Sequence, residues 1–489
     1  MSMFWAALSL SRLPLESFLR ASSTAEAWAV AENRHVLDCT AAAFAHGVRP
    51  GMARAAAAAL LPSLRFRERD PLAERAALEG LAGWAGRYTP NVALAERPAR
   101  PAQPRQPFSP HGLLLEVSGS LKLFGGIEPI CAGLAQGVQE MGYTGALACA
   151  PTAQGAWLLA RGGASSPCLG LGELHRRLQP LSVETLDCDA RTLATLEAVG
   201  VRTLGEVLAL PRAGLALRFG EALSDELDRA LGARPDPRAF FASPERFHAA
   251  LEFPVEVREA GMLVFAVQRL LVQLGGFLVA RDSGVQRLRI DLFHKEALTS
   301  VEIGLVRPSR DTGHLALLAR EKLASLALRE PVRRIALAAD EILALAHTNL
   351  DLLDEALKRP GDWAGLLERL RARLGNGAVN GIAQAADHRP EAAWRVMKPG
   401  ERGAAYERGA RPLWLLQTPK RLAEVGAAPH RDGPLALLAG PERIESGWWD
   451  GRDAARDYFI ARAQTEALLW IYRERQSNSA HWYLHGIFG

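Results

Sequence analysis

The stretch GLLLEVSGSLKLFGG, at residues 112–126, opens with a short apolar run made of Leu113–Leu115 and Val117. A proline-rich stretch precedes this run and Ser118-Gly119 follows it, as expected of a buried strand that ends in a turn. Taken alone, the pattern fits any core strand. Further motifs follow in order along the chain, and together they make the interpretation specific.

The composition is that of a globular protein with several domains. The chain has 489 residues, of which 48% are hydrophobic and 23% charged, so about three or more domains are expected. A net charge of +4 permits nucleic-acid binding without requiring it. The five cysteines show no Cys-x-x-Cys spacing, which favours neither a disulfide framework nor a zinc site and fits a reducing cytosol.

The N-terminal pattern is not that of an export signal. Met3–Leu10 is apolar, but no Lys or Arg precedes it and Arg12 ends it. No uninterrupted apolar stretch approaches the ~20 residues that a membrane span needs. We therefore expect a cytoplasmic protein that does not associate with a membrane.

Two predicted strands resemble the palm strands of a Y-family (translesion) DNA polymerase: Phe4–Leu10 and the strand that opens residues 112–126. The resemblance implies that the metal-binding acids of this family fall on neutral or non-anionic positions here, namely Ser9, Ser11, His111 and Gly112. None of these supplies the anionic oxygen ligands that Mg²⁺ requires. A two-metal displacement without carboxylates has no clamp for the attacking and leaving oxygens. The resemblance thus implies a polymerase fold without catalytic residues, metal or cofactor.

Two further segments resemble the family but lack its triphosphate ligands. In the finger segment, the places of a Tyr and an Arg fall on Ala41 and Phe44. At the junction of the last palm strand with its helix, Pro151-Thr152 stands where the family has Asn-Lys. A triphosphate needs cationic and hydrogen-bonding partners, which these residues do not provide.

Two regions are predicted to contact DNA phosphates. Leu193–Gly232 resembles the helix-hairpin-helix thumb, in which backbone N–H groups at the hairpin grip phosphates, and the candidate residues are Val199, Gly200, Val201 and Arg202. Thr203 and Glu206 predict a capping box. Phe247–Leu345 resembles the little finger in a β-α-β-β-α-β order, with Arg287 and Arg289 on the outer face of a strand. Between Arg246 and Asp340, 14 Lys/Arg against 11 Asp/Glu leave +3. For the thumb, the alternative to DNA contact is a helical hairpin used only for packing. For the little finger, the alternative is a charged face exposed to solvent.

The C-terminal region carries two candidate partner motifs. One resembles the bacterial sliding-clamp peptide, an extended apolar segment, and comprises Asn349, Leu350, Asp351, Leu352 and Leu353. An amphipathic helix start is the alternative. The other is Trp448, Trp449, Asp450 and Gly451, in a tail rich in Trp and Tyr. Trp470, Tyr472, Trp482 and Tyr483 follow, and at least half of these six aromatic residues are expected to fill a small β core.

The whole pattern resembles the ImuB-like group of inactive Y-family homologues, accessory proteins of the bacterial mutasome. The implied fold is α+β and multidomain: palm and fingers at 1–165 (fingers about 21–75), thumb at 166–240, little finger at 246–345, a clamp-binding linker at 346–360, and an extension with a β-rich end at 361–489.

The resemblance implies an adaptor in damage-induced (SOS) translesion synthesis and DNA repair. Its partners would be primer-template DNA without sequence preference, the sliding clamp, an error-prone C-family polymerase and a RecA-like accessory protein. Two alternatives stay open. One is an active translesion polymerase with displaced metal ligands, for which Glu116 is a candidate. The other is a DNA-repair adaptor that does not contact primer ends.

Overall fold

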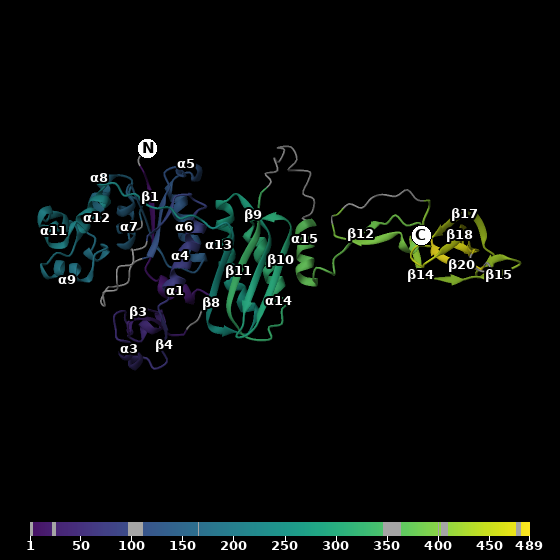
Figure 1. The fold of residues 1–489 in the computed structure, drawn as a ribbon, viewed down its shortest axis with the longest axis horizontal. Coiled ribbons are helices and arrows are strands. Elements are labelled where there is room, and N and C mark those ends of the chain that lie inside the picture. The colour runs from purple at the N-terminus through teal and green to yellow at the C-terminus, as the bar shows by residue number, and fades with distance from the viewer. Residues whose placement is uncertain are drawn as a thin grey trace. The chain divides into compact units, whose positions relative to one another are not determined.

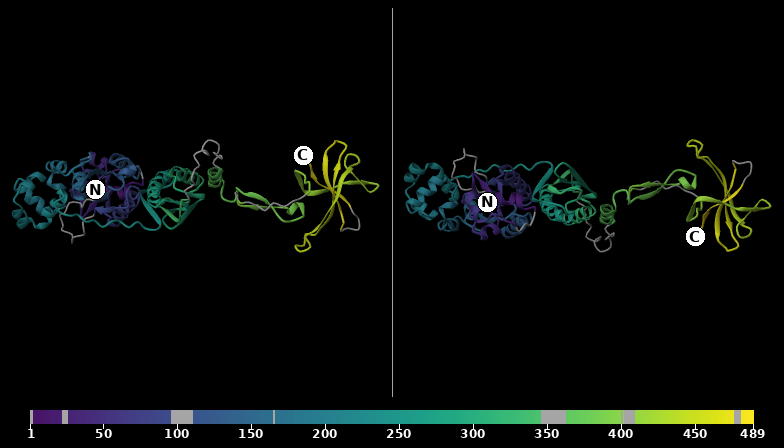
Figure 2. Two further views of the ribbon diagram at one scale, coloured as in Figure 1. Left: turned by 90° about the horizontal axis from the view of Figure 1, so that it is seen from above. Right: turned by 90° about the horizontal axis from the view of Figure 1, so that it is seen from below.

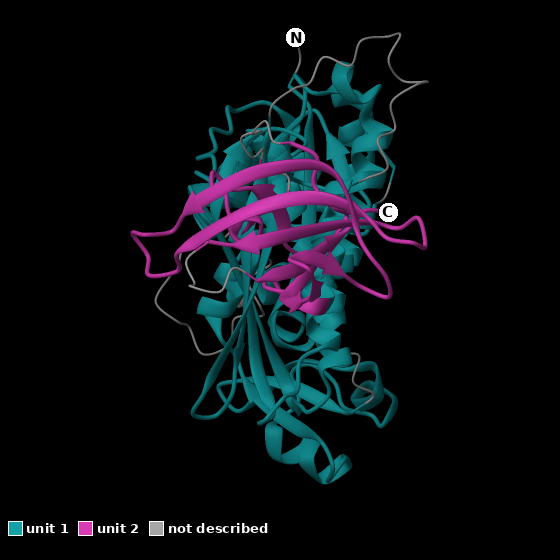
Figure 3. Ribbon diagram, turned by 90° about the vertical axis from the view of Figure 1, so that its right-hand side faces the viewer, with its two compact units in different colours: residues 1–373 teal, residues 374–489 magenta. Residues whose placement is uncertain are grey.

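The computed structural model describes residues 3–21, 26–95, 111–164, 166–345, 363–399, 401, 409–475 and 481–489. The chain forms two compact units, Met1–Arg373 and Leu374–Gly489 (Figure 3). Both contain β-sheets, and the first also carries most of the helices, so the predicted α+β class is confirmed.

The first unit is organised around a four-stranded palm sheet. In spatial order its strands are β5 (Val92–Ala95), β6 (His111–Glu116), β1 (Trp5–Leu10) and β7 (Ala146–Ala150). Side chains alternate along β1. Trp5 and Ala7 pack with α7 (Ala153–Arg161), whereas Leu8 and Leu10 pack on the other face. That face is covered by α4 (Pro71–Ala85) and α6 (Ile127–Glu140) (Figure 1).

The finger region is small and packs around its own core. Its elements are β2 (Trp28–Glu32), β3 (His35–Cys39), α2 (Ala41–Ala45), α3 (Arg54–Leu60) and β4 (Arg65–Glu68). Strands β2 and β3 pair antiparallel as a hairpin. Helix α1 (Leu13–Leu19) connects β1 to this region.

The thumb region is helical. Its helices are α8 (Leu171–Leu178), α9 (Ala190–Ala198), α10 (Leu204–Ala209), α11 (Arg212–Phe219) and α12 (Glu221–Leu231). The predicted capping box is confirmed: Thr203 caps α10, and the Glu206 side chain returns to the backbone of the cap residue.

The little-finger region has the predicted β-α-β-β-α-β order. Its elements are β8 (Phe247–Val257), α13 (Ala260–Ala280), β9 (Ser283–Phe293), β10 (Leu298–Ser309), α14 (Thr312–Ala324) and β11 (Val332–Ala344). The sheet order is β10-β9-β11-β8. One face of this sheet packs on α13 and α14 to form the largest core of the unit.

Helix α13 is apolar, although Gln268, Arg269 and Gln273 interrupt its apolar run. It is 21 residues long with a mean hydropathy of 1.8 over its most apolar window, enough to cross a membrane by length and composition alone. The window is 61% buried, and α13 packs between the little-finger sheet and α4. Its apolar composition is therefore explained as that of a core helix.

Trp84 of α4 packs against two other helices. A Cβ on Gly137 of α6 would lie 2.0 Å from the Trp84 ring, and a Cβ on Gly276 of α13 would lie 2.2 Å from it. The absence of side chains at these two glycines lets the indole ring fit between α6 and α13. The palm and the little finger thus share a tightly packed contact.

Helix α15 (Trp363–Leu374) belongs, up to Arg373, to the first unit. The Glu368 carboxylate accepts a hydrogen bond from Val306 N–H at 2.6 Å and lies 2.5 Å from His314 Nε2. The compact C-terminal extension consequently begins at Leu374, later than the predicted boundary at 361.

The C-terminal unit is a twisted five-stranded sheet with two small hairpins (Figure 2). The sheet strands, in spatial order, are β14 (Trp414–Arg421), β20 (Trp482–Ile487), β19 (Leu468–Glu474), β18 (Ala454–Arg462) and β17 (Ala436–Ser446). The hairpins are β12 (Gly381–Gln384) with β13 (Trp394–Met397), and β15 (Ala423–Val425) with β16 (Ala428–His430). The β-rich end expected for this region is confirmed.

Candidate nucleic-acid interface and the predicted metal site

The backbone brings together three of the four positions at which the resemblance implies the family's metal-binding acids. In the antiparallel pairing of β1 with β6, Ser9 lies opposite Gly112 and Leu10 lies opposite His111. Ser9 is 5% exposed. Ser11 lies in the turn after β1 and is exposed.

Gly112 has no room for a side chain. A Cβ there would lie 2.0 Å from the Leu8 carbonyl oxygen and 2.6 Å from the ring of Trp157. Trp157 on α7 is itself buried in the palm core. A carboxylate at position 112 would therefore require both the indole ring and the backbone to move.

His111 faces the opposite side of the sheet, where α4 lies. Its Nε2 is 3.0 Å from Glu74 Oε2 and 3.2 Å from an Arg69 guanidinium nitrogen. Arg69 also donates to Glu74 at 2.8 Å and to Glu32 at 3.1 Å. Arg69, which is paired with two acids, thus lies beside His111, where the resemblance implies an acid in the polymerase family.

Glu74 is charged in this cluster although it is only 1% exposed. Burial alone would raise the pKa of its carboxyl, but hydrogen bonds from His111 and Arg69 outweigh burial and hold the pKa below its ordinary value. The cluster is therefore a closed ion-pair network, with the acid already satisfied by protein donors.

Glu116 lies at the other end of β6. It pairs with Trp5, whereas His111 pairs with Leu10, and five strand residues span about 17 Å. Its carboxylate accepts hydrogen bonds from Asn91 Nδ2 at 3.1 Å and Ser118 N–H at 3.0 Å. Burial would raise the pKa of Glu116, but these hydrogen bonds hold it below its ordinary value. This geometry counts against Glu116 as a displaced metal ligand.

The triphosphate positions serve other structural roles. Ala41 and Phe44 lie on the short helix α2, and the guanidinium of Arg49 stacks 3.6 Å from the Phe44 ring centroid. Thr152 caps α7 by accepting from Gly155 N–H, and it donates to the Ala230 carbonyl at 2.7 Å. Its hydroxyl therefore joins α7 to the thumb helix α12.

The thumb hairpin is exposed, but its backbone N–H groups are already engaged. Gly200 has a φ of +78°, which favours glycine, and a Cβ there would have open space around it. The N–H groups of Val199, Gly200 and Val201 donate to carbonyls of α9. Those of Arg202 and Thr203 donate to the Glu206 carboxylate at 2.7 and 3.0 Å. A phosphate that binds the Arg202 and Thr203 N–H groups would have to displace the Glu206 carboxylate.

The two predicted little-finger arginines are also paired. Arg287 lies 3.5 Å from Glu341, and Arg289 lies 2.9 Å from Asp291. Both arginine side chains remain about half exposed. The local charge of this strand is thus largely compensated, and the +3 of the region does not form a basic stripe along β9.

The clamp-like motif, Asn349–Leu353, lies outside the described residues. In the C-terminal unit, Trp448 and Trp449 are 80% and 60% exposed in the turn between β17 and β18. Arg389 fixes this turn through two hydrogen bonds to Asp450, at 2.9 and 2.7 Å. Gly451 has a φ of +71° in the same turn. The expectation that at least half of the six tail aromatics fill a core is confirmed by three of them: Trp470, Tyr472 and Trp482.

Sequence reasoning missed Arg69, Glu74 and Trp157. Asp70 and Pro71 are recognisable signals for the start of α4, and Glu74 fits the first turn of a helix. Nothing in that pattern reveals that the carboxylate is buried against His111, because this contact joins elements far apart in sequence.

Comparison with known proteins gives sequence matches over most of the chain. Residues 1–161 match the model of the impB/mucB/samB family. Protein ImuB from Caulobacter vibrioides, in strains NA1000 / CB15N and ATCC 19089 / CIP 103742 / CB 15, is 30% identical over 473 residues, covering 91% of this chain and 100% of the relative.

Similar solved structures include a Dbh ternary complex and DinB from Sulfolobus solfataricus, at 14% and 15% identity. Each match covers 70% of this chain and 100% of that chain. Their TM-scores of 0.36 and 0.37 are low, so family assignment depends on the sequence matches.

We predict that Arg69→Met lowers the free energy of unfolding by about 3–5 kcal/mol, because it leaves Glu74 buried without its guanidinium partner. Urea unfolding followed by tryptophan fluorescence measures the change. Arg75→Met, which breaks the exposed pair with Glu79, is the matched control and should cost about 1 kcal/mol or less. Equal effects of the two variants would contradict the buried network.

The same network predicts a pH dependence. Because the pKa of Glu74 is lowered by folding, its contribution is fully present above the ordinary value of 4.5 and is lost as pH falls through the folded-state pKa. The stability difference between wild type and Glu74→Gln should therefore shrink below about pH 4.5.

Proposed function

The chain belongs to the ImuB family of Y-family polymerase homologues, and on that premise we propose that it is a non-catalytic adaptor in error-prone translesion synthesis. In this role it binds primer-template DNA and the sliding clamp and brings other proteins to them. The observation that carries the proposal is the filled palm centre, in which Trp157 occupies the space beside Gly112 and Arg69 lies beside His111.

Two-metal nucleotidyl transfer needs converging carboxylates with unfilled coordination capacity. Within the described residues, no group of three or more His, Cys, Asp or Glu side chains is arranged to hold a metal ion. The acid nearest to the predicted site, Glu74, is already hydrogen-bonded to Arg69 and His111. These features support a palm that has a structural role.

The runner-up is an active polymerase that uses Glu116. Glu116 lies far along β6 from the paired positions Ser9 and Gly112. Its carboxylate already accepts hydrogen bonds from Asn91 and Ser118. Both observations favour the adaptor over an active polymerase. A third reading, a repair adaptor that never contacts primer ends, differs from the first only in its DNA substrate.

We predict that the purified chain does not extend a primer with Mg²⁺ or Mn²⁺, because the paired palm positions Ser9 and Gly112 supply no carboxylates for the two metals. A gel-based primer-extension assay beside an active Y-family polymerase tests this. Glu116→Ala is the matched variant and should give the same background as wild type. Incorporation by wild type that disappears in Glu116→Ala would establish the runner-up.

DNA contact is proposed at the thumb hairpin and the outer face of the little finger, through phosphates and not base edges. Val199, Gly200 and Arg202 are exposed, whereas Val201 is buried, and Arg287 and Arg289 stay about half exposed. Because Glu206 holds the hairpin amides, its carboxylate competes with phosphate for them.

We predict that Glu206→Gln increases affinity for primer-template DNA several-fold at low salt, because a charge that repels phosphate is removed while an acceptor for the cap remains. Fluorescence anisotropy over a salt series measures this. Glu221→Gln, an exposed acid at the start of α12, is the control for net charge alone. Equal gains in both variants would argue against phosphate contact at the hairpin.

The proposed partners are the sliding clamp, an error-prone C-family polymerase and a RecA-like protein, in the cytoplasm during the damage response. Asn349–Leu353 would bind the clamp groove as an extended peptide. Trp448 and Trp449 support a separate docking surface, since both are exposed on a turn that Arg389 and Asp450 hold in place.

We predict that the two motifs act independently. Leu352→Ala with Leu353→Ala should abolish clamp pull-down and spare the other partners, since truncating two anchors costs about 2 kcal/mol or more. Trp448→Ala with Trp449→Ala should do the reverse. Each double variant is the control for the other. A clamp interaction that survives the leucine changes would show that the motif is misassigned.

A further inference from the structure

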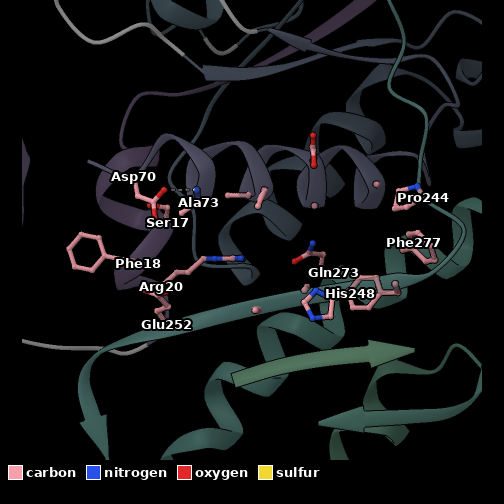
Figure 4. Close-up of a pocket in the computed structure, with 18 of the residues that line it drawn as sticks. Ser17, Phe18, Arg20, Asp70, Ala73, Pro244, His248, Glu252, Gln273 and Phe277 are labelled. Carbon is pink, nitrogen blue, oxygen red and sulfur yellow. Dashed lines mark hydrogen bonds between the residues drawn. The ribbon is translucent and has the colours of Figure 1, made fainter. Parts of the chain in front are cut away.

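A cavity of about 590 Å³ lies in the first unit between α4 and the little-finger strand β8, away from the paired positions Ser9 and Gly112. Helix α1 and helix α13 complete its walls (Figure 4). Its volume falls within the ~300–1,000 Å³ typical of small-molecule sites. No role in the proposed adaptor function accounts for it.

Two buried polar side chains line this cavity without a protein partner. Arg20, just after α1, is 7% exposed, and Gln273 on α13 is 6% exposed. Across the described part of the chain, neither side chain makes a hydrogen bond or an ion pair, although the Arg20 guanidinium lies over the Tyr143 ring at 4.6 Å. Figure 4 shows Arg20 extending toward Gln273. Buried polar groups in folded proteins are normally satisfied, and the Arg20 Nε is buried without a hydrogen-bond partner, so this group indicates a missing ligand.

The charge around Arg20 is positive and uncompensated. Glu16, which acts on the neighbouring Arg269, accepts the Thr144 N–H at 2.9 Å. Burial, followed by the charge of Arg20, lowers the pKa of Arg269 to about 10. Two neighbouring guanidinium groups therefore share the Tyr143 environment without a carboxylate partner of their own.

The acids in the cavity wall are already engaged. Asp70 caps α4 by accepting from Leu72 and Ala73, Glu79 pairs with Arg75, and Glu252 pairs with Arg67. In contrast, Arg246 and Arg334 line the cavity and form no ion pair within the described residues. His248 adds a further basic group. The lining thus carries four arginines against three acids, which favours an anionic ligand.

We propose that this cavity binds a nucleotide-sized phosphate ester. Arg20 would hold the phosphate, since a guanidinium matches phosphate oxygens with paired donors, and Gln273 would supply an amide donor beside it. Arg246 and Arg334 would balance the remaining charge. The apolar wall, which includes Phe18, Phe241, Phe247 and Phe277, offers aromatic area for a base.

The phosphate ester would be either a free nucleotide or one nucleotide unit of single-stranded DNA. The proposal does not depend on the adaptor function, because none of its residues belongs to the palm centre, the thumb hairpin, the clamp motif or the tail turn.

The test is a titration of the full chain with four probes: inorganic phosphate, pyrophosphate, dATP and a 5′-phosphorylated thymidine oligonucleotide. Calorimetry and thermal unfolding follow binding. We expect Arg20→Met to weaken binding about ten-fold or more and Gln273→Leu to weaken it less. Arg212→Met, in the thumb and outside the cavity wall, should bind as wild type does. Without ligand, Arg20→Met should unfold at the same or a higher temperature than wild type, because it removes an unpaired buried charge.

Saturable binding of dATP that depends on Arg20 would support a free nucleotide. A response to the oligonucleotide alone, with the same dependence on Arg20, would support single-stranded DNA as the source. Absence of binding by all four probes at millimolar concentration would overturn the proposal. So would equal affinity in Arg20→Met and wild type, and Gln273→Leu provides the same comparison if Arg20→Met does not fold.

Discussion

The packing of helix α4 is the constraint on which the first unit depends. At its C-terminal end, Trp84 fits between Gly137 and Gly276, where even a methyl group would clash with the ring. At its N-terminal end, Glu74 binds His111 and Arg69. One helix thus joins the palm sheet to the little finger and also closes the palm centre. Overpacking either glycine would strain the whole contact, since close-packed interiors do not yield easily.

The palm centre is filled by protein groups at the positions where the resemblance implies metal-binding acids. A magnesium site requires a local excess of negative charge that the bound ions neutralise. Here the Arg69 guanidinium neutralises the nearby acids, and the other face of the sheet is filled by the Trp157 ring. Both contacts favour a packed core over an open site. The sheet therefore serves as a rigid support for the regions around it.

The distribution of positive charge differs from what the sequence count suggests. Arg287 and Arg289 on the little-finger strand lie beside acids, and the thumb hairpin carries Glu206 on its own amides. The uncompensated guanidinium groups of Arg20, Arg246 and Arg334 instead gather at the cavity beside α4. A net charge of +3 over a region therefore says little about where an anion binds, because an arginine that is ion-paired with an acid attracts an anion less than an unpaired one.

The sequence by itself determined the order of the elements. Periodicity and turn signals predicted the βαββαβ order of the little finger and the Thr203–Glu206 cap, because these depend on local backbone preferences and side-chain alternation. The tertiary structure alone decided what surrounds Ser9, His111 and Gly112. The contacts of Trp157 with Gly112, of Glu74 with His111, and of Arg20 with its cavity join residues distant in sequence, and burial and pairing at that range leave no local pattern.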